Sequence, residues 1–427
     1  MYREITRCRV CGNTALDPIL DLGMLAFTGI FPKSADQLVP SAPLQLVKCR
    51  EGVDGEACGL VQLKHSCEAS VMYGANYGYR SGLNQSMVKH LHTKAAAIKA
   101  FRPLRQGDLV LDIGSNDGTL LKAFDAPGVE LLGMDPTGVK FREFYPPHIR
   151  LVADFFSAAA YRQLYGGRKA AVITSIAMFY DLESPLDFMR QVTDILSPDG
   201  VWVFEQSYLP AMLANTSYDT ICHEHLEYYR LRQIDWMCQR AGLKILDVEL
   251  NASNGGSFSV TVAKESASLP VNEPRVRGAL REEGVGGYDA LPVYESFRER
   301  VFRHREELMR FLDYAVREGE RMIGYGASTK GNVVLQFCGV TRREVPFIAE
   351  VNSDKFGAFA PGTLIPIISE QEARSMRPDG FLVLPWHFRD SIIARESAFL
   401  SQGGKLVFPL PAIEVIGAPS ALQTSPT

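Results

Sequence analysis

The sequence lacks a strong excess of charge, long apolar runs and any tandem repeat. Its 427 residues carry a formal net charge of −4, which gives no cationic field for nucleic acid or for an anionic membrane. No segment approaches the roughly 20 unbroken apolar residues of a membrane helix. The opening residues, MYREITRCRVCG, are polar and charged, unlike a secretory signal. We therefore expect a cytoplasmic monomer that binds neither nucleic acid nor membranes.

Disulfides are not expected in such a protein, so its eight cysteines are interpreted as thiols or metal ligands. Cys8 and Cys11 form a C-x-x-C-G knuckle, and Cys49 and Cys58 form a second, wider pair. Four thiolates suit a structural zinc ion, although the usual second pair encloses only two residues. Cys67 is a competing ligand, and reduced, metal-free cysteines are the alternative.

The segment LVLDIGSNDGTLL, residues 109–121, is typical of a strand, a sharp turn and a helix start. Gly114 allows the tight turn, and Gly118 allows close packing of helix and strand. The spacing differs from the G-x-G-x-x-G of pyrophosphate-binding proteins. It resembles motif I of class I methyltransferases, which bind S-adenosylmethionine. The alternative is an ordinary strand–loop–helix corner.

Acidic residues follow three successive predicted strands and support the cofactor interpretation. A carboxylate at the tip of the second strand can hold a ribose diol, as Asp135 would. A carboxylate followed by aromatic residues, as at Asp154, can clamp adenine. The predicted cofactor-binding residues are Asp112, Gly114, Asn116, Asp117, Gly118, Asp135, Pro136, Asp154, Phe155, Phe156 and Ser175.

Strands alternate with helices through the middle of the chain, which predicts a parallel sheet with helices on both faces. The fold class is therefore α/β: a class I methyltransferase Rossmann-like domain with an N-terminal zinc-binding module and a second C-terminal α/β, Rossmann-like domain. Residues 266–285 are predicted to be a linker, and 288–318 a long charged helix. The predicted units are a zinc module at 1–75, the methyltransferase domain at 76–270, the C-terminal domain at 271–412 and a loose tail at 413–427.

The chemistry is predicted to lie in Cys222-His223-Glu224-His225, just after the fifth strand. The H-x-H spacing differs from the i, i+4 spacing of a helical zinc pair. A general base built from His225, oriented by Glu224, is one interpretation; a metal site and a surface loop are the others. Histidine starts with a pKa of about 6.5, so it needs little tuning as a base.

Polar residues that could face a substrate occur in three further segments. Residues 72–92 form either a linker helix with aromatic packing or a lid. Residues 254–257 form a Gly-Gly turn between two predicted strands. Residues 324–331, GYGASTKG, follow a strand and open a helix, as in a second nucleotide-binding corner with Glu350 beyond it. The predicted substrate-binding residues are Ser81, Asn84, His90, Cys222, His223, Asn254, Gly255, Gly256, Ser257 and Lys330.

Over nearly its whole length the chain resembles the three-domain sugar C-methyltransferases of deoxysugar biosynthesis. The matching motifs are CRVCG, YGYRSG, LDIGSNDG, YDTICHEHLEYYRL, NGGSFSV, GYGASTKGN and PGTLIPI. The resemblance implies methylation of a ring carbon, typically C3, of a nucleotide-linked 4-keto-6-deoxy sugar. It implies His225 with Glu224 as the base region, Tyr77 or Tyr79 as sugar contacts with catalytic potential, and Lys330 beside the nucleotide diphosphate.

Two departures from the family pattern are the wide second cysteine pair and Cys222, where members often carry tyrosine. Three other functions stay open. They are methylation of another small molecule, a nicotinamide-dependent oxidoreductase or epimerase using residues 324–331, and a non-catalytic zinc- and nucleotide-binding protein. The chain lacks the Tyr-x-x-x-Lys pair expected of such an oxidoreductase or epimerase, and that function leaves motif I unexplained.

Overall fold

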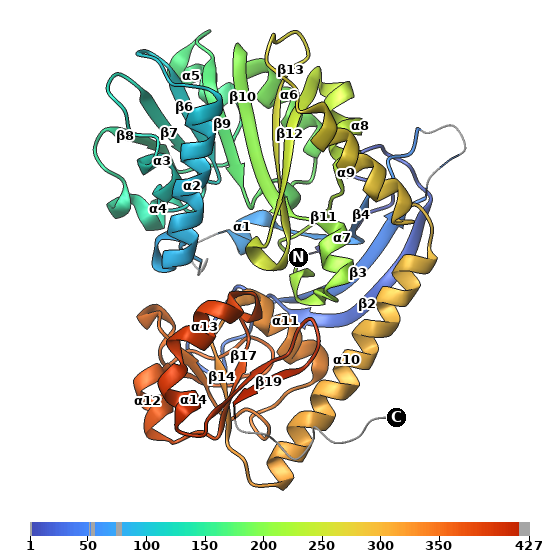
Figure 1. The fold of residues 1–427 in the computed structure, drawn as a ribbon, viewed down its shortest axis with the longest axis vertical. Helices are drawn as coiled ribbons and strands as arrows, with labels where there is room; N and C mark the ends of the chain where they lie inside the picture. Colours follow the sequence, from blue (N-terminus) through green and yellow to red (C-terminus); the bar gives the residue numbers. More distant parts are fainter. Residues whose placement is uncertain (1, 51, 53–55, 74–78, 418–427) are drawn as a thin grey trace.

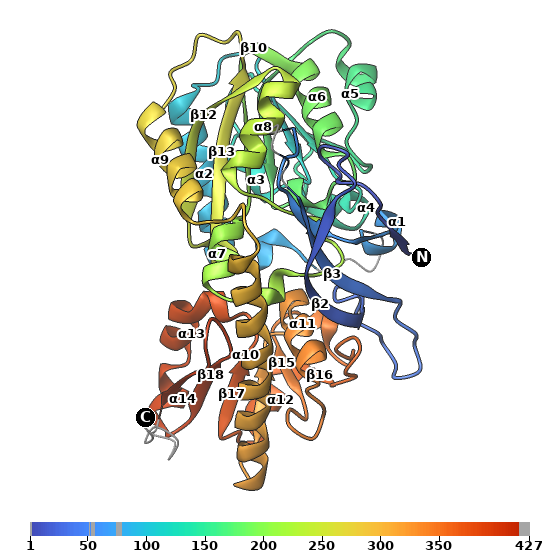
Figure 2. The same cartoon turned by 90° about the vertical axis from the view of Figure 1, so that its right-hand side faces the viewer.

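The computed structural model describes residues 2–50, 52, 56–73 and 79–417 (Figure 1). A seven-stranded sheet with its helices forms the upper body, and a six-stranded sheet forms the lower one. The N-terminal strands β2 and β3 lie beside both bodies (Figure 2). Among the described residues, no helix is long and apolar enough to cross a membrane.

The upper sheet has the strand order β12-β13-β10-β9-β6-β7-β8. Its central strands are parallel and buried on both faces, as their continuous apolar runs predict. β13 runs antiparallel between β10 and β12, which is the class I methyltransferase arrangement. The strands are β6 Leu109–Ile113, β7 Glu130–Met134, β8 Ile149–Val152, β9 Ala170–Ile176, β10 Leu196–Ser207, β12 Leu243–Asn251 and β13 Ser257–Lys264.

Alternation along β10 directs side chains into two separate cores. Trp202 and Phe204 pack with α6 and α8 on one face, while Val201 and Val203 pack with α2 on the other. The helices of this body are α2 Gln85–Phe101, α3 Thr119–Lys122, α4 Gly138–Phe141, α5 Ala158–Tyr165, α6 Pro185–Ile195, α7 Leu209–Ala214, α8 Leu231–Ala241 and α9 Glu273–Val285.

Helix α9 corrects the expectation of a linker at 266–285. The side chain of Asn272 accepts a hydrogen bond from the Arg275 backbone N–H and caps the helix, and a proline stands in its first turn. Val276 is buried against the methyltransferase core, and α9 packs on β12 and α8. Tertiary packing therefore overrides a composition that is typical of a loop.

The N-terminal module has a four-stranded sheet of order β11-β4-β3-β2. Its edge strand β11, Glu227–Tyr228, comes from the segment just after the His-Glu-His motif. The other elements are β1 Tyr2–Glu4, β2 Leu16–Ala26, β3 Ser41–Cys49, β4 Val61–Leu63, β5 His65–Cys67 and α1 Ala69–Met72.

The C-terminal body starts with the long helix α10 Pro292–Arg317, and its sheet has the order β16-β15-β14-β17-β18-β19. Strand β14 lies between β15 and β17, which makes its C-terminal end a topological switch point. Residues 414–417 form the edge strand β19, although a loose tail was expected from residue 413. The remaining elements are β14 Met322–Tyr325, α11 Thr329–Cys338, β15 Ile348–Glu350, β16 Ile367–Ser369, α12 Glu370–Ser375, β17 Gly380–Val383, α13 Arg389–Arg395, α14 Ser397–Ser401, β18 Lys405–Phe408 and β19 Glu414–Gly417.

Candidate active site

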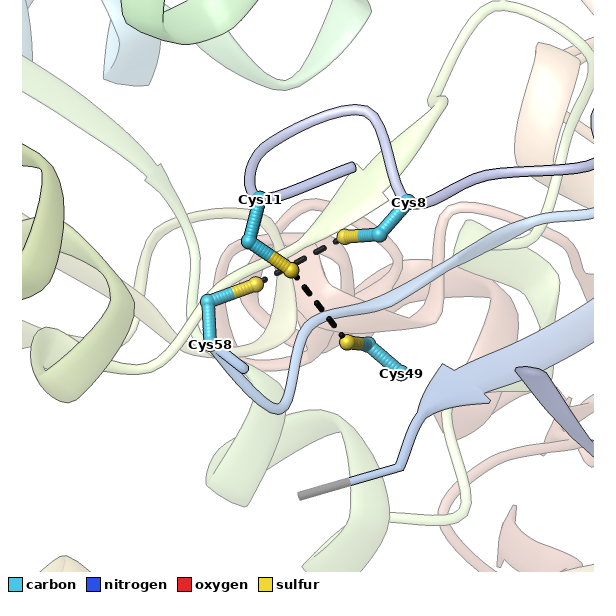
Figure 3. Close-up of side chains that lie close together, drawn as sticks. All are labelled: Cys8, Cys11, Cys49 and Cys58. Carbon is cyan, nitrogen blue, oxygen red and sulfur yellow. Dashed lines mark hydrogen bonds between the residues drawn. The ribbon is translucent and has the colours of Figure 1, made fainter. Parts of the chain in front are cut away.

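The four predicted cysteine ligands converge on one point (Figure 3). Their sulfur atoms all lie within 4.8 Å of one another, and the Cys8–Cys58 and Cys11–Cys49 pairs are each 3.5 Å apart. A tetrahedron of zinc–sulfur bonds spaces its sulfurs by about 3.8 Å, so the cluster fits zinc. Cys67 lies outside the cluster. An all-cysteine site is closed to substrate, so its role is structural.

The zinc module is tied to the segment that carries the His-Glu-His motif. The Gln233 amide donates to the Cys58 carbonyl oxygen at 2.8 Å. Between the two zinc-knuckle cysteines, Arg9 has its Nε 3.8 Å from the Glu227 carboxylate, and both side chains are buried. The Leu63 N–H donates to the Leu226 carbonyl at 2.8 Å. The metal site therefore supports the loop that follows His225.

Motif I folds as a tight turn at the end of β6. The Asp135 carboxylate accepts a hydrogen bond from the Asn116 N–H at 2.7 Å and also accepts from Thr137. Gly118 has φ +71°, and a Cβ there would lie 3.1 Å from the Tyr145 ring, so both strain and space require glycine. The acidic strand tip and the glycine turn face each other, as a ribose site requires.

Two more predicted cofactor residues are buried beside this turn. Thr174 donates to the Asp112 carboxylate at 2.7 Å. Burial raises the pKa of Asp112 to about 7, and the hydrogen bond from Thr174 opposes that rise. The hydroxyl of Ser175 accepts from the Trp202 indole at 3.1 Å, so its side chain is used inside the sheet.

The predicted adenine clamp divides between surface and core. Phe155 is 47% exposed, and its N–H donates to the Asp154 carboxylate at 2.7 Å. Phe156 instead packs edge-on against Phe188, with ring centroids 5.1 Å apart. Pro136, next to the ribose carboxylate, is half-buried. Of the two phenylalanines, Phe155 therefore has the aromatic face that remains accessible to adenine.

The predicted lid is hydrogen-bonded to motif I. The Ser81 N–H donates to the Asn116 side chain and the Gly82 N–H to the Asp117 carboxylate, both at 2.9 Å. Tyr79 is 47% exposed, and Tyr77 lies outside the described residues. The side chain of Asn84, a predicted substrate contact, caps α2.

His90 lies on α2 and contacts the end of β10. Its Nε2 is 2.5 Å from the Glu205 carboxylate, which also binds Lys94 at 3.0 Å and the Asn251 amide at 2.9 Å. Burial raises the pKa of Glu205, but His90 and Lys94 outweigh it and the net shift is downward. The sequence interpretation did not include Glu205, although it ends a predicted strand.

Within the part of the chain that the structure describes, one ring nitrogen of His225 is hydrogen-bonded and the other has no partner. Nδ1–H donates to the Thr220 carbonyl at 2.8 Å, which leaves the lone pair on Nε2. The imidazole lies 4.3 Å, centroid to centroid, from the Tyr180 ring. Burial lowers the pKa of His225 to about 4, and the Lys330 charge adds to this shift. The imidazole is therefore neutral at physiological pH.

The expected orienting role of Glu224 needs correction, because Thr220 holds His225 and no hydrogen bond joins the two neighbours. Glu224 is buried, and burial raises its pKa. A Cβ on Gly29 would lie 2.8 Å from its Oε1, so the N-terminal module covers it. Adjacent residues of this loop point in different directions.

Cys222 and His223 also belong to the interior. His223 donates through Nε2 to the Ala42 carbonyl at 3.0 Å and packs on Phe27. Cys222 is 1% exposed, and burial raises the pKa of its thiol well above the ordinary value. Both side chains are predicted substrate contacts that the structure places among protein atoms.

The methyltransferase and C-terminal units meet around Lys330. Its ammonium donates to the Asn254 carbonyl at 2.8 Å, and the Trp386 indole donates to the Asp219 carboxylate at 2.7 Å. Gly255 has φ +90°, and a Cβ there would lie 3.0 Å from Trp386. The predicted Gly-Gly turn is confirmed as η5 Ser253–Gly255, ending at Gly256 before β13. Ser257 donates its hydroxyl to the Ser253 carbonyl.

At the predicted second nucleotide corner, the strand-end carboxylate is hydrogen-bonded to the protein backbone. The Glu350 carboxylate accepts hydrogen bonds from the backbone N–H groups of Ala327, Val351 and Asn352 at 2.7–2.9 Å. Asp135 at motif I accepts hydrogen bonds of the same kind, so the two strand tips are built alike.

Sequence spacing could not reveal Thr220, Tyr180, Asp219 and Trp386 as parts of this site. Thr220 acts through its backbone carbonyl, and Trp386 lies far along the chain from Asp219. Only proximity to the His-Glu-His motif could have drawn attention to Asp219 and Thr220.

Comparison with known families identifies the units. Residues 8–73 match the family described as "Putative zinc binding domain", 87–248 match "Methyltransferase domain", and 252–411 match "C-methyltransferase C-terminal domain". With motif I and the seven-stranded sheet, these matches define an S-adenosylmethionine-dependent methyltransferase with a zinc site.

A curated relative specifies the chemistry. The C-methyltransferase NovU of Streptomyces niveus is 30% identical over 425 residues, covering 99% of both chains. The chain therefore belongs to the C-methyltransferase family, and it is an S-adenosylmethionine-dependent C-methyltransferase.

Two solved structures match part of this chain. The CcbJ methyltransferase of Streptomyces caelestis is 16% identical with a TM-score of 0.32, covering 41% of this chain and 89% of its own. An S-adenosylmethionine-dependent methyltransferase of Clostridium acetobutylicum is 17% identical with a TM-score of 0.32, covering 42% and 92%.

Proposed function

We propose that the enzyme methylates C3 of a nucleotide-linked 4-keto-6-deoxy sugar in deoxysugar biosynthesis. The observation that carries this proposal is the position of His225. Among the described residues its Nε2 has no hydrogen-bond partner. The ring contacts Tyr180, in the turn directly after β9, and lies beside a polar junction of the methyltransferase and C-terminal units. A base at that position can act on a carbon held between the methyl donor and the C-terminal body.

Unpartnered buried atoms at the junction favour a ligand rich in hydroxyl groups. Within the described residues, the Ser217 and Thr220 hydroxyls, one Asp219 oxygen and His387 Nδ1 have no hydrogen-bond partner. Each such group costs about 1–3 kcal/mol when left unpaired. A sugar ring can supply donors and acceptors to several of them at once.

The chemistry needs a carbon nucleophile. A hydrogen on carbon next to a ketone is acidic enough for a positioned histidine to remove. Thr220 fixes the imidazole tautomer, so Nε2 takes the proton and an enolate results. When bound, S-adenosylmethionine supplies an electrophilic methyl group on a sulfonium. Asp135, Gly114 and the Asn116 turn are the residues that would hold it.

The nucleotide part of the proposed substrate rests on the resemblance carried by the GYGASTKGN segment. The test is incubation with S-adenosylmethionine and a panel of nucleotide-linked sugars, with and without a 4-keto group. We expect a mass gain of one methyl only for keto sugars, located at C3 by NMR. Methylation of a non-keto sugar, or of no member of the panel, would contradict the proposal.

A further inference from the structure

We infer that the Lys330 ammonium binds the carbonyl oxygen beside the reacting carbon, and does not serve as a phosphate ligand. This inference rests on the proposed function, because it names the group that receives the negative charge of the enolate. It assigns to the C-terminal body a direct part in the proton abstraction.

Lys330 reaches out of its own unit. It is the second residue of α11, and its Nζ donates to the carbonyl oxygen of Asn254 in η5, which links two strands of the methyltransferase sheet. Because the sheet binds its ligands near that edge, the ammonium lies where the two bodies meet. Its position is therefore between the two bodies.

Two backbone N–H groups at the start of α11 are already hydrogen-bonded within the protein. The Gly331 N–H donates to the Ser328 hydroxyl at 3.0 Å, and the Ala327 N–H donates to Glu350. A helix N-terminus binds phosphate through free backbone N–H groups, and these two are already used. The other lysine of this corner, Lys355, donates to the Ala327 carbonyl at 2.7 Å.

Lys330 shares its surroundings with the proposed base. Helix α11 packs on η4 Tyr218–Thr220, whose last residue holds His225. Asp219, in the same turn, is buried with one oxygen unpartnered in the described parts of the chain. Burial lowers the pKa of the Lys330 ammonium, and the negative charge of Asp219 opposes that shift. The base, the cation and its counter-charge thus occupy one junction between the two bodies.

The chemistry balances with these groups alone. The C–H bond next to the ketone breaks, and its proton moves to His225 Nε2. The electron pair forms a carbon–carbon double bond, while the carbonyl π electrons move onto oxygen. That oxygen accepts a hydrogen bond from Lys330, which keeps its protons. Because His225 is a weak base, enolate formation depends on stabilising this oxygen.

The test compares Lys330→Met with the wild type on a keto sugar that the panel identifies. Solvent deuterium exchange at the carbon next to the ketone is followed by NMR, with S-adenosylhomocysteine present so that no methyl can be transferred. We expect both exchange and kcat to fall about 10²–10³-fold, as when one oxyanion donor is removed. We expect the Kd of the free nucleoside diphosphate and that of S-adenosylmethionine to change less than about twofold.

Normal exchange with weakened nucleoside diphosphate binding would overturn the inference and make Lys330 a phosphate ligand. Absence of exchange and methylation in the wild type would instead remove the proposed function, and the inference with it. Lys405→Met is the matched control: this buried lysine pairs with Glu320 at the opposite end of the same sheet, and exchange should be unchanged. Should Lys330→Met fail to fold, Lys330→Arg decides, with an expected loss in exchange of about tenfold or more.

Discussion

The His225 imidazole lies edge-on against the Tyr180 phenol ring, with centroids 4.3 Å apart. Tyr180 belongs to η3 Phe179–Asp181, and Met178 just before it lies 2.9 Å from where a Cβ on Gly114 would be. Two successive contacts therefore lead from the motif I turn to the proposed base. Any change that moves η3 should alter cofactor binding and proton abstraction together.

Replacing the base tests the assignment of His225. We expect His225→Ala to lower kcat by about 10²–10⁴-fold, the usual contribution of a general base, while the Kd of S-adenosylmethionine stays unchanged. Initial rates and calorimetry measure the two quantities. His148→Ala, an exposed histidine beside Asp125, is the control and should behave as wild type. Wild-type rates in His225→Ala would exclude it as the base.

The protonation of His225 can be followed directly. Burial and the Lys330 charge lower its pKa to about 4, so its imidazole stays neutral as the pH falls from 8 to 5 and gains a proton only near pH 4. NMR of histidine-labelled enzyme should show no titration of this ring above pH 5. Removing the charge in Lys330→Met should raise the pKa. A midpoint near 6.5 in the wild type would contradict the buried geometry.

Two of the predicted carboxylate contacts of the cofactor should contribute differently to its binding. Asp135 is buried and faces the glycine turn, whereas Asp154 accepts from its own neighbour at the surface. Loss of a hydrogen bond to a charged group costs about 1.5–3 kcal/mol, so Asp135→Ala should raise the Kd of S-adenosylmethionine about 10- to 100-fold. Asp154→Ala should raise it less. Equal rises in this Kd for the two variants, measured by calorimetry, would contradict the prediction.

Metal analysis should find about one zinc per chain, because the four sulfurs already lie within 4.8 Å of one another. Cys49→Ser should lose the metal and lower the thermal midpoint, since metal binding contributes folding free energy. Cys67→Ser is the control, because this cysteine lies outside the cluster, and its zinc content should stay at one. Zinc retained in Cys49→Ser and lost in Cys67→Ser would reassign the ligand set.

Local patterns in the sequence predicted much of the fold. Continuous apolar runs marked β6 and β9 because parallel strands are buried on both faces. The cysteine spacing found the metal cluster despite the wide second pair. Helix α9 was missed because its stability comes from packing on β12, which no local pattern records.

The site was harder to predict because its contacts join residues far apart in the chain. The motif located His225, but Thr220 orients it through a backbone carbonyl that any residue type could provide. Asp219 and Trp386 form one hydrogen bond across two units, and spacing carries no information about such a pair.

Strand β11 has a consequence for how this enzyme can change over evolutionary time. Because Glu227 and Tyr228 pair with β4, two residues from the catalytic core complete a sheet that belongs to the N-terminal module. A recombination event that exchanged that module for a foreign one would strip this short strand of its partner and release the imidazole two positions upstream. We therefore expect the N-terminal module and the methyltransferase domain to be inherited together.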